Sequence, residues 1–174
     1  MIFADRATTD QIPPITSDLF KSIMATAPGP ATVVTSFTKD GAPCGLTMTA
    51  VCSVSLMPPL ALACLSNSSN TLAALKETEA FSINYLTEGA EDLAMHFAKK
   101  SSSKFGTTEW SRPERGIGGP LLLTIAAYAA CKVINIFDVG DHAVVIGEVV
   151  EGGVRAGAVA LAYADRRFFS LANA

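Results

Sequence analysis

Most of the chain after residue 30 alternates between apolar and polar positions, with turn-forming residues between the runs. Residues 32–35 and 44–49 flank a turn at 39–41, which predicts a β-hairpin. Pro58 and Pro59 separate the next two runs, so a turn or a sheet edge is expected there. Further strands are predicted at 53–56, 60–65, 81–86, 125–137, 142–150, 160–163 and 168–171. Many short strands separated by turns predict an antiparallel β-barrel with a few helices.

The first helix is predicted between residue 17 and the Pro28-Gly29-Pro30 sequence, which a helix cannot cross. Ser17 is a candidate N-cap. Helical spacing places four apolar side chains on one face: Leu19, Phe20, Ile23 and Met24. We expect this face to pack against the body of the protein.

Two further helices and one long connection follow. The polar loop 66–71 leads directly into a helical pattern over 72–76, and a loop that ends at a helix N-terminus can bind an anion. Residues 88–99 predict another helix. Residues 101–119 are rich in Ser, Gly and charged residues, so an exposed connection is expected.

Composition and charge narrow the classes of function. An apolar fraction of 49% beside 17% charged residues favours apolar surface reserved for a second subunit or a flat ligand. The net charge of -3 and the absence of a basic cluster argue against a nucleic-acid partner. Since neither a signal peptide nor a membrane-spanning segment is predicted, we expect a cytoplasmic protein. The 174 residues are expected to form an N-terminal extension at 1–16 and one domain at 17–174.

The common catalytic and cofactor motifs are absent from the sequence. The four cysteines have no Cys-x-x-Cys spacing and there are two histidines, so no metal site is predicted. There is neither a phosphate-binding Gly-Lys-Ser/Thr loop nor a Gly-x-Ser-x-Gly elbow. The glycines at 116–119 are followed by Pro120 instead of a helix start, which excludes a Rossmann fingerprint.

Residues 45–60, GLTMTAVCSVSLMPPL, resemble the hallmark segment of the flavin reductase-like, FMN-binding split-barrel family. Residues 30–35, the Gly140-Asp141-His142 turn, residues 147–149, and Tyr163 with Arg166 extend the resemblance, which runs from Phe20 to Leu171. It is greatest to the reductase components of two-component flavin-dependent monooxygenases. The fold that the resemblance implies is mostly β, an antiparallel Greek-key split β-barrel with a few peripheral helices.

The function that the resemblance implies is that of an NAD(P)H:flavin oxidoreductase. Such an enzyme transfers a hydride from NADH or NADPH to FMN or FAD, and the reduced flavin diffuses to a separate oxygenase. The resemblance also implies a homodimer with the flavin close to the subunit interface. Two alternatives stay open: a flavoprotein that keeps a prosthetic flavin and reduces another acceptor, and a flavin-binding module without catalysis.

The resemblance also assigns site residues. Segment 47–50 would lie along the flavin ring and offer backbone amides, and the loop at 66–71 would hold the ribityl and phosphate groups, with Lys104 as the counter-charge. The full set of expected flavin contacts is Thr47, Met48, Thr49, Ala50, Ser53, Cys64, Leu65, Ser66, Asn67, Ser68, Ser69, Thr71, Phe97, Ala98, Lys104 and Phe105. His142, which on the residues alone would be an exposed turn histidine, is expected to be catalytic and to bind the nicotinamide together with Tyr163 and Arg166.

Overall fold

The computed structural model describes residues 12–101 and 103–172, so the predicted extension at 1–16 lies outside it except for 12–16. The helices are α1 (Ser17–Thr26), α2 (Asn70–Thr78) and α3 (Glu91–Ala98), with a 3-10 turn, η1 (Lys104–Gly106). The strands are β1 (Gly29–Pro30), β2 (Thr32–Phe37), β3 (Pro43–Met48), β4 (Val51–Leu56), β5 (Pro59–Ser66), β6 (Ala80–Leu86), β7 (Trp110–Ser111), β8 (Leu121–Leu122), β9 (Ile125–Val139), β10 (His142–Val154), β11 (Leu161–Ala164) and β12 (Arg167–Ser170).

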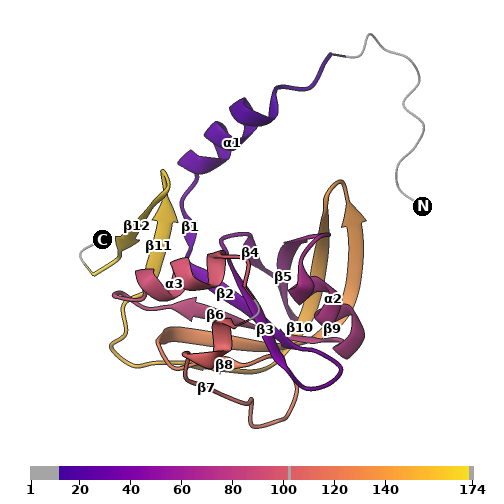
Figure 1. Cartoon of the computed structure of the whole chain (residues 1–174), viewed down its shortest axis with the longest axis vertical. Helices are drawn as coiled ribbons and strands as arrows, with labels where there is room; N and C mark the ends of the chain where they lie inside the picture. Colours follow the sequence, from indigo (N-terminus) through magenta and orange to yellow (C-terminus); the bar gives the residue numbers. More distant parts are fainter. Residues whose placement is uncertain (1–11, 102, 173–174) are drawn as a thin grey trace.

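Seven strands form one antiparallel sheet in the order β3-β2-β6-β9-β10-β5-β4 (Figure 1). In the described part of the chain, the end strand β3 pairs with β2 alone and β4 with β5 alone, although β3 and β4 are consecutive and joined by Thr49 and Ala50. The sheet is therefore an open barrel, split between β3 and β4. The two strands predicted last in the chain pair with each other as β11 and β12, and β1 joins them in a separate three-stranded sheet. The predicted mostly-β, antiparallel split barrel is confirmed.

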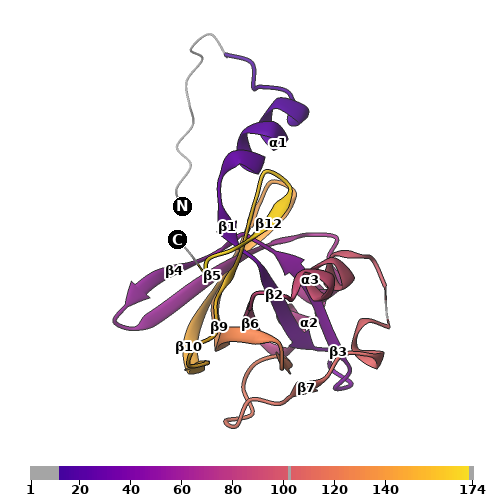
Figure 2. The same ribbon diagram turned by 90° about the vertical axis from the view of Figure 1, so that its left-hand side faces the viewer.

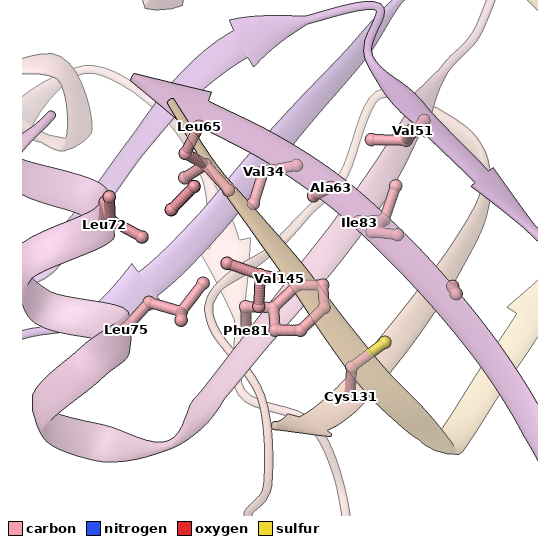
Figure 3. Packing of buried hydrophobic residues seen from close by; sticks show 12 residues of the cluster. Val34, Val51, Ala63, Leu65, Leu72, Leu75, Phe81, Ile83, Cys131 and Val145 are labelled. Atoms are coloured by element: carbon pink, nitrogen blue, oxygen red, sulfur yellow. The ribbon is translucent and has the colours of Figure 1, made fainter. Parts of the chain in front are cut away.

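The main core lies inside the curved sheet (Figure 3). Successive strand residues point to opposite faces, so alternate residues of three strands enter this core, with Val34 from β2. They are Ala61, Ala63 and Leu65 of β5, Phe81 and Ile83 of β6, and Ala143 and Val145 of β10. Val34, Leu65, Phe81 and Val145 are buried completely and face one another from these strands. Gly147 is required for this packing, since a Cβ there would lie 2.6 Å from the Phe81 ring.

Helix α1 projects from the body of the molecule instead of packing on it (Figures 1 and 2). Thr16, and not Ser17, is the N-cap; its hydroxyl accepts from the Leu19 amide at 3.3 Å. The helix has no buried residue, and the four apolar side chains of its predicted packing face are 50–55% exposed. The expected packing is wrong for the single chain because the described residues place no element over this face. None of the described helices is both long and apolar enough to cross a membrane.

The prediction of an exposed connection at 101–119 is confirmed for Ser101 and Ser103 and wrong where the segment turns into the protein, at Lys104, at Pro113 and at its C-terminal end. Lys104 is buried, and so are Gly118 and Gly119 together with the following Pro120. The backbone carbonyls of this end accept hydrogen bonds from buried side chains: Ser82 Oγ donates to Gly119 O at 2.9 Å, and Asn84 Nδ2 to Pro120 O at 3.1 Å. Polar backbone can be buried here because remote side chains satisfy it.

Candidate functional site

A cavity of about 240 Å³ opens between the end of β3, helix α3 and the β11–β12 hairpin. Its lining residues are Ala31, Thr47, Met48, Thr49, Ala94, Met95, Ala98, Tyr163 and Phe168. The rings of Tyr163 and Phe168 form one wall, with centroids 4.9 Å apart. Alanines and the β3 backbone form the opposite walls, so the cavity fits a flat, largely apolar ring. Five of the predicted site residues meet here: Thr47, Met48, Thr49, Ala98 and Tyr163.

Helix α3 lies directly against β3, which fixes the walls of the cavity. The Thr47 hydroxyl donates to the Ala94 carbonyl, so this side chain holds α3 and is already engaged. Gly45 allows the close approach, because a Cβ there would lie 3.0 Å from Thr35 and 3.4 Å from the Phe97 ring. Phe97 itself is a fully buried residue of α3.

The split of the barrel exposes backbone beside the cavity. Thr49 and Ala50 lie between the β2–β3 ladder, which ends at Met48, and the β4–β5 ladder, which begins at Val51. Their carbonyls accept from Val51 and Cys64, whereas their amides lie outside both ladders. These two amides are therefore donors that a ring in the cavity could use.

The backbone amides of the polar loop predicted to hold an anion are largely satisfied by bonds within the loop and to the turn between β9 and β10. The Asn67 amide donates to Asp141 O, the Ser68 amide to Ser66 Oγ, and the Ser69 amide to Ser66 O. Ser69 is the N-cap of α2, and its hydroxyl accepts from the amides of Thr71 and Leu72. An anion at this loop could bind the hydroxyls of Ser66 and Ser68, which lie 3.0 Å apart, or the exposed Asn67 side chain, whose Nδ2 donates to Gly140 O at 3.4 Å, or it could displace the cap.

Four predicted contacts lie inside the protein: Leu65, Phe97, Thr71 and Lys104. Leu65 and Phe97 are fully buried core residues, and Thr71 is 3% exposed. Burial also raises the pKa of the Cys44 thiol, which donates to Ser36 O at 3.3 Å. These buried side chains pack behind the site and do not line its surface.

The structure directs the Lys104 ammonium toward backbone carbonyls. Its Nζ donates to Phe97 O at 2.7 Å and to Gly45 O at 3.1 Å, and burial lowers the pKa of Lys104. Phe105, the next predicted contact, packs edge-on against Phe97 with centroids 5.0 Å apart. Both protein groups that Lys104 binds belong to β3 and α3, not to the loop at 66–71.

The remaining predicted flavin contacts lie near the split. Ala50 and Ser53 are exposed at the start of β4, and Cys64 is partly buried on the neighbouring strand β5. The Cys64 amide donates to Ala50 O at 2.9 Å, which links the cavity end of the split to the strand that leads to Ser66.

The three predicted nicotinamide contacts are not brought together in one copy of the chain. His142 begins β10 opposite Ser66, and its Nδ1 lies 2.7 Å from Asp141 Oδ1, a hydrogen bond that lowers the pKa of Asp141. Tyr163 lines the cavity, and Arg166 is exposed in the β11–β12 turn. Figure 1 shows the β9–β10 tip and the β11–β12 hairpin on opposite sides of the molecule.

Four cavity residues were not predicted from the sequence: Ala31, Ala94, Met95 and Phe168. Alanine and methionine give no chemical signal of a site. The position of Phe168 could have been inferred, because it is the cross-strand partner of Tyr163 in the β11–β12 hairpin.

Comparisons with known proteins show what the chain is similar to. Residues 24–172 match the family model described as "Flavin reductase like domain". The chain is 42% identical over 142 residues to the flavin reductase (NADH) of Kitasatospora aureofaciens, covering 81% of this chain and 74% of the relative. It is 34% identical over 130 residues to the flavin-dependent monooxygenase reductase subunit HsaB of Mycobacterium tuberculosis, covering 75% and 68%. Among solved structures, the NADH:FAD oxidoreductase SgcE6 of Streptomyces globisporus, in complex with NAD and FAD fragments, superposes with a TM-score of 0.85 at 28% identity, covering 95% of this chain and 98% of that one.

Proposed function

This chain belongs to the flavin reductase-like domain family, and from that premise we propose that it is an NAD(P)H-dependent flavin reductase supplying reduced flavin to a separate monooxygenase. The observation that carries the proposal is the cavity between β3, α3 and the Tyr163–Phe168 pair. It combines a flat apolar slot with the two amides of the barrel split, which suits a flavin ring.

Each part of the site has a distinct task in this proposal. The amides of Thr49 and Ala50 hydrogen-bond the polar edge of the ring, and Met48 and Ala98 contact its faces. Ser66, Asn67 and Ser68 bind the ribityl tail, with Ser53 and Cys64 between tail and ring. The flavin supplies the two-electron acceptor when it is bound. The protein contributes orientation and exclusion of water, which hydride transfer needs more than an acid or a base.

We also propose that the enzyme is a homodimer whose site is completed across the subunit interface. Within one chain His142 lies opposite Ser66, at the tail end of the proposed site, and far from Tyr163 and Arg166. The three proposed nicotinamide contacts could therefore meet only if a second copy supplies part of the set. The unpartnered apolar face of α1 supports a dimer independently. His142 would then hold the nicotinamide carboxamide and offset charge on the reduced ring. The four unpaired thiols are consistent with a cytoplasmic location, which is part of the proposal.

Absorbance and turnover of the purified protein test the proposed activity. We expect little flavin absorbance after purification, and NADH or NADPH oxidation that saturates with added FMN or FAD. Tightly co-purifying flavin that resists dialysis would instead identify a flavoprotein with a prosthetic group. Flavin binding without nicotinamide oxidation would identify a binding module, and neither binding nor oxidation would refute the proposal.

A further inference from the structure

Lys104 is a buried cation without a carboxylate partner among the described residues. Only 9% of the residue is exposed, and none of the salt bridges of the described chain includes it. Its ammonium donates to two backbone carbonyls, Gly45 O on β3 and Phe97 O in the last turn of α3. A buried charge requires a reason, because burial disfavours an ammonium group unless strong hydrogen bonds compensate.

The two acceptors lie on the two elements that form facing walls of the cavity. Phe97 precedes Ala98, which lines the α3 wall, and Gly45 lies two residues before Thr47, which lines the β3 wall. The carbonyl at the C-terminal end of a helix has no partner within the helix and carries the negative end of the helix dipole, so it binds an ammonium group well. Lys104 therefore fastens the end of α3 to β3.

A second cross-link joins the same two elements one turn earlier. The Thr47 hydroxyl donates to Ala94 O, so β3 and α3 are held at Thr47–Ala94 and at Gly45–Lys104–Phe97. Three of the cavity-lining residues, Ala94, Met95 and Ala98, lie on the segment of α3 between or beside these two points. The spacing of the walls thus depends on both cross-links.

We propose that Lys104 is a positioning residue that sets the distance between α3 and β3, and thereby the fit of the cavity to the flavin ring, and that it is not a counter-charge for the flavin phosphate. The proposal rests on the proposed function in taking the ligand to be a flavin. It replaces the role that the sequence resemblance gave to Lys104. Binding of riboflavin, FMN and FAD distinguishes the two roles of Lys104, because the three flavins share one ring and differ only in the tail.

Lys104→Met removes the charge and keeps the length of the side chain. Lys99→Met is the matched control, since Lys99 is an exposed lysine that directly follows α3. Dissociation constants for riboflavin, FMN and FAD are measured by quenching of flavin fluorescence. We expect Lys104→Met to raise all three by a common factor of roughly tenfold, which is about 1.4 kcal/mol, with the ratios among the three changing less than about twofold. Lys99→Met should change none of them.

Hydrogen exchange of the flavin-free protein provides a readout that does not depend on flavin. Lys104→Met should speed exchange of the α3 amides, whereas Lys99→Met should not. If Lys104→Met fails to fold, Thr47→Val removes the other cross-link and should give the same pattern with the three flavins. A loss at least fivefold greater for FMN and FAD than for riboflavin would show a counter-charge and overturn the proposal, as would unchanged binding of all three. If the wild-type protein binds no flavin, the proposed function fails, and α3 exchange alone decides the role of Lys104.

Discussion

If the proposed dimer forms through the apolar face of α1, disrupting this face should separate the two copies without unfolding the subunit. The double variant Phe20→Asp/Ile23→Asp places two carboxylates on this face. Neither side chain contributes to the core, since α1 has no buried residue. Circular dichroism and the unfolding midpoint of the barrel should therefore change little.

The size of the effect follows from the exposed fractions. Phe20 is 55% exposed and Ile23 50% exposed, so about half of each side chain is available for burial by a partner. Complete burial of such a side chain is worth about 1.5–3 kcal/mol, so half is worth about 1 kcal/mol. Two residues in two symmetry-related copies give about 4 kcal/mol, which raises the dimer dissociation constant by about a thousandfold. The desolvation of buried carboxylates adds to this loss.

Analytical ultracentrifugation at micromolar concentration is the assay. We expect a wild-type dimer and a monomeric variant, and we expect flavin reduction to fall with the dimer because the proposed site needs both copies. Ser22→Asp is the control: it adds one carboxylate to each helix on the opposite face, against two in the test variant, and should remain a dimer. A wild-type monomer that binds flavin, or a variant that dimerises as tightly as the wild type, would refute the reasoning.

Three further outcomes are expected. His142→Ala should keep the fold and most of the flavin affinity, because the side chain is 48% exposed and bonds only to the exposed Asp141; stopped-flow bleaching should show reduction slowed about tenfold, a loss of about 1.4 kcal/mol, and an unchanged rate would leave His142 a turn residue. Asn84→Ala removes a side chain that donates to Val33 O, Thr35 Oγ1 and Pro120 O and accepts from the Leu122 amide. Urea unfolding should therefore show that the free energy of unfolding falls by about 3 kcal/mol or more, and a loss below about 1 kcal/mol would contradict the role of this network. Burial raises the pKa of Cys131 to about 12, so iodoacetamide at pH 8 should label Cys131 only after unfolding, as peptide mass spectrometry can test, and rapid labelling of the native protein would contradict this burial.

The sequence predicted the strands well because their signal is local. Alternation and turn residues are properties of neighbouring positions, and the hairpin expected at 32–35 and 44–49 is observed as β2 and β3 with a continuous register from Thr32–Met48 to Phe37–Pro43. The helices after the polar loop and after β6 likewise formed within a few residues of their expected bounds.

What the sequence could not give are contacts between remote segments. The apolar face of α1 predicts burial but does not say against what, and the single chain offers no partner. Gly119 and Pro120 are buried because Ser82, Asn84 and Thr35 satisfy their carbonyls from positions at least 36 residues away. No local pattern encodes such bonds.

The candidate site likewise has a part that the sequence predicted and a part that it did not. The resemblance identified the segment at 47–49 together with Ala98 and Tyr163, which the fold does bring to one cavity. It could not show that the Lys104 ammonium turns inward, because lysine is a surface residue in most proteins and its acceptors here are backbone carbonyls of other elements.

The split between β3 and β4 has a mechanical consequence. The two strands are joined through the peptide bonds of Thr49 and Ala50, and in the described residues no ladder hydrogen bond connects them. Elsewhere in the sheet, parting two strands breaks a row of hydrogen bonds, each with a net value of about 0.5–1.5 kcal/mol. Parting this seam breaks no ladder hydrogen bond and loses only side-chain packing, such as that of Leu46, Met48 and Val51 in the main core, so we expect the barrel to open there more readily than between paired strands. On this reasoning a planar molecule would enter or leave beside the cavity while the six strand pairings of the sheet keep their register, and exchange of the ligand would be separate from unfolding of the protein.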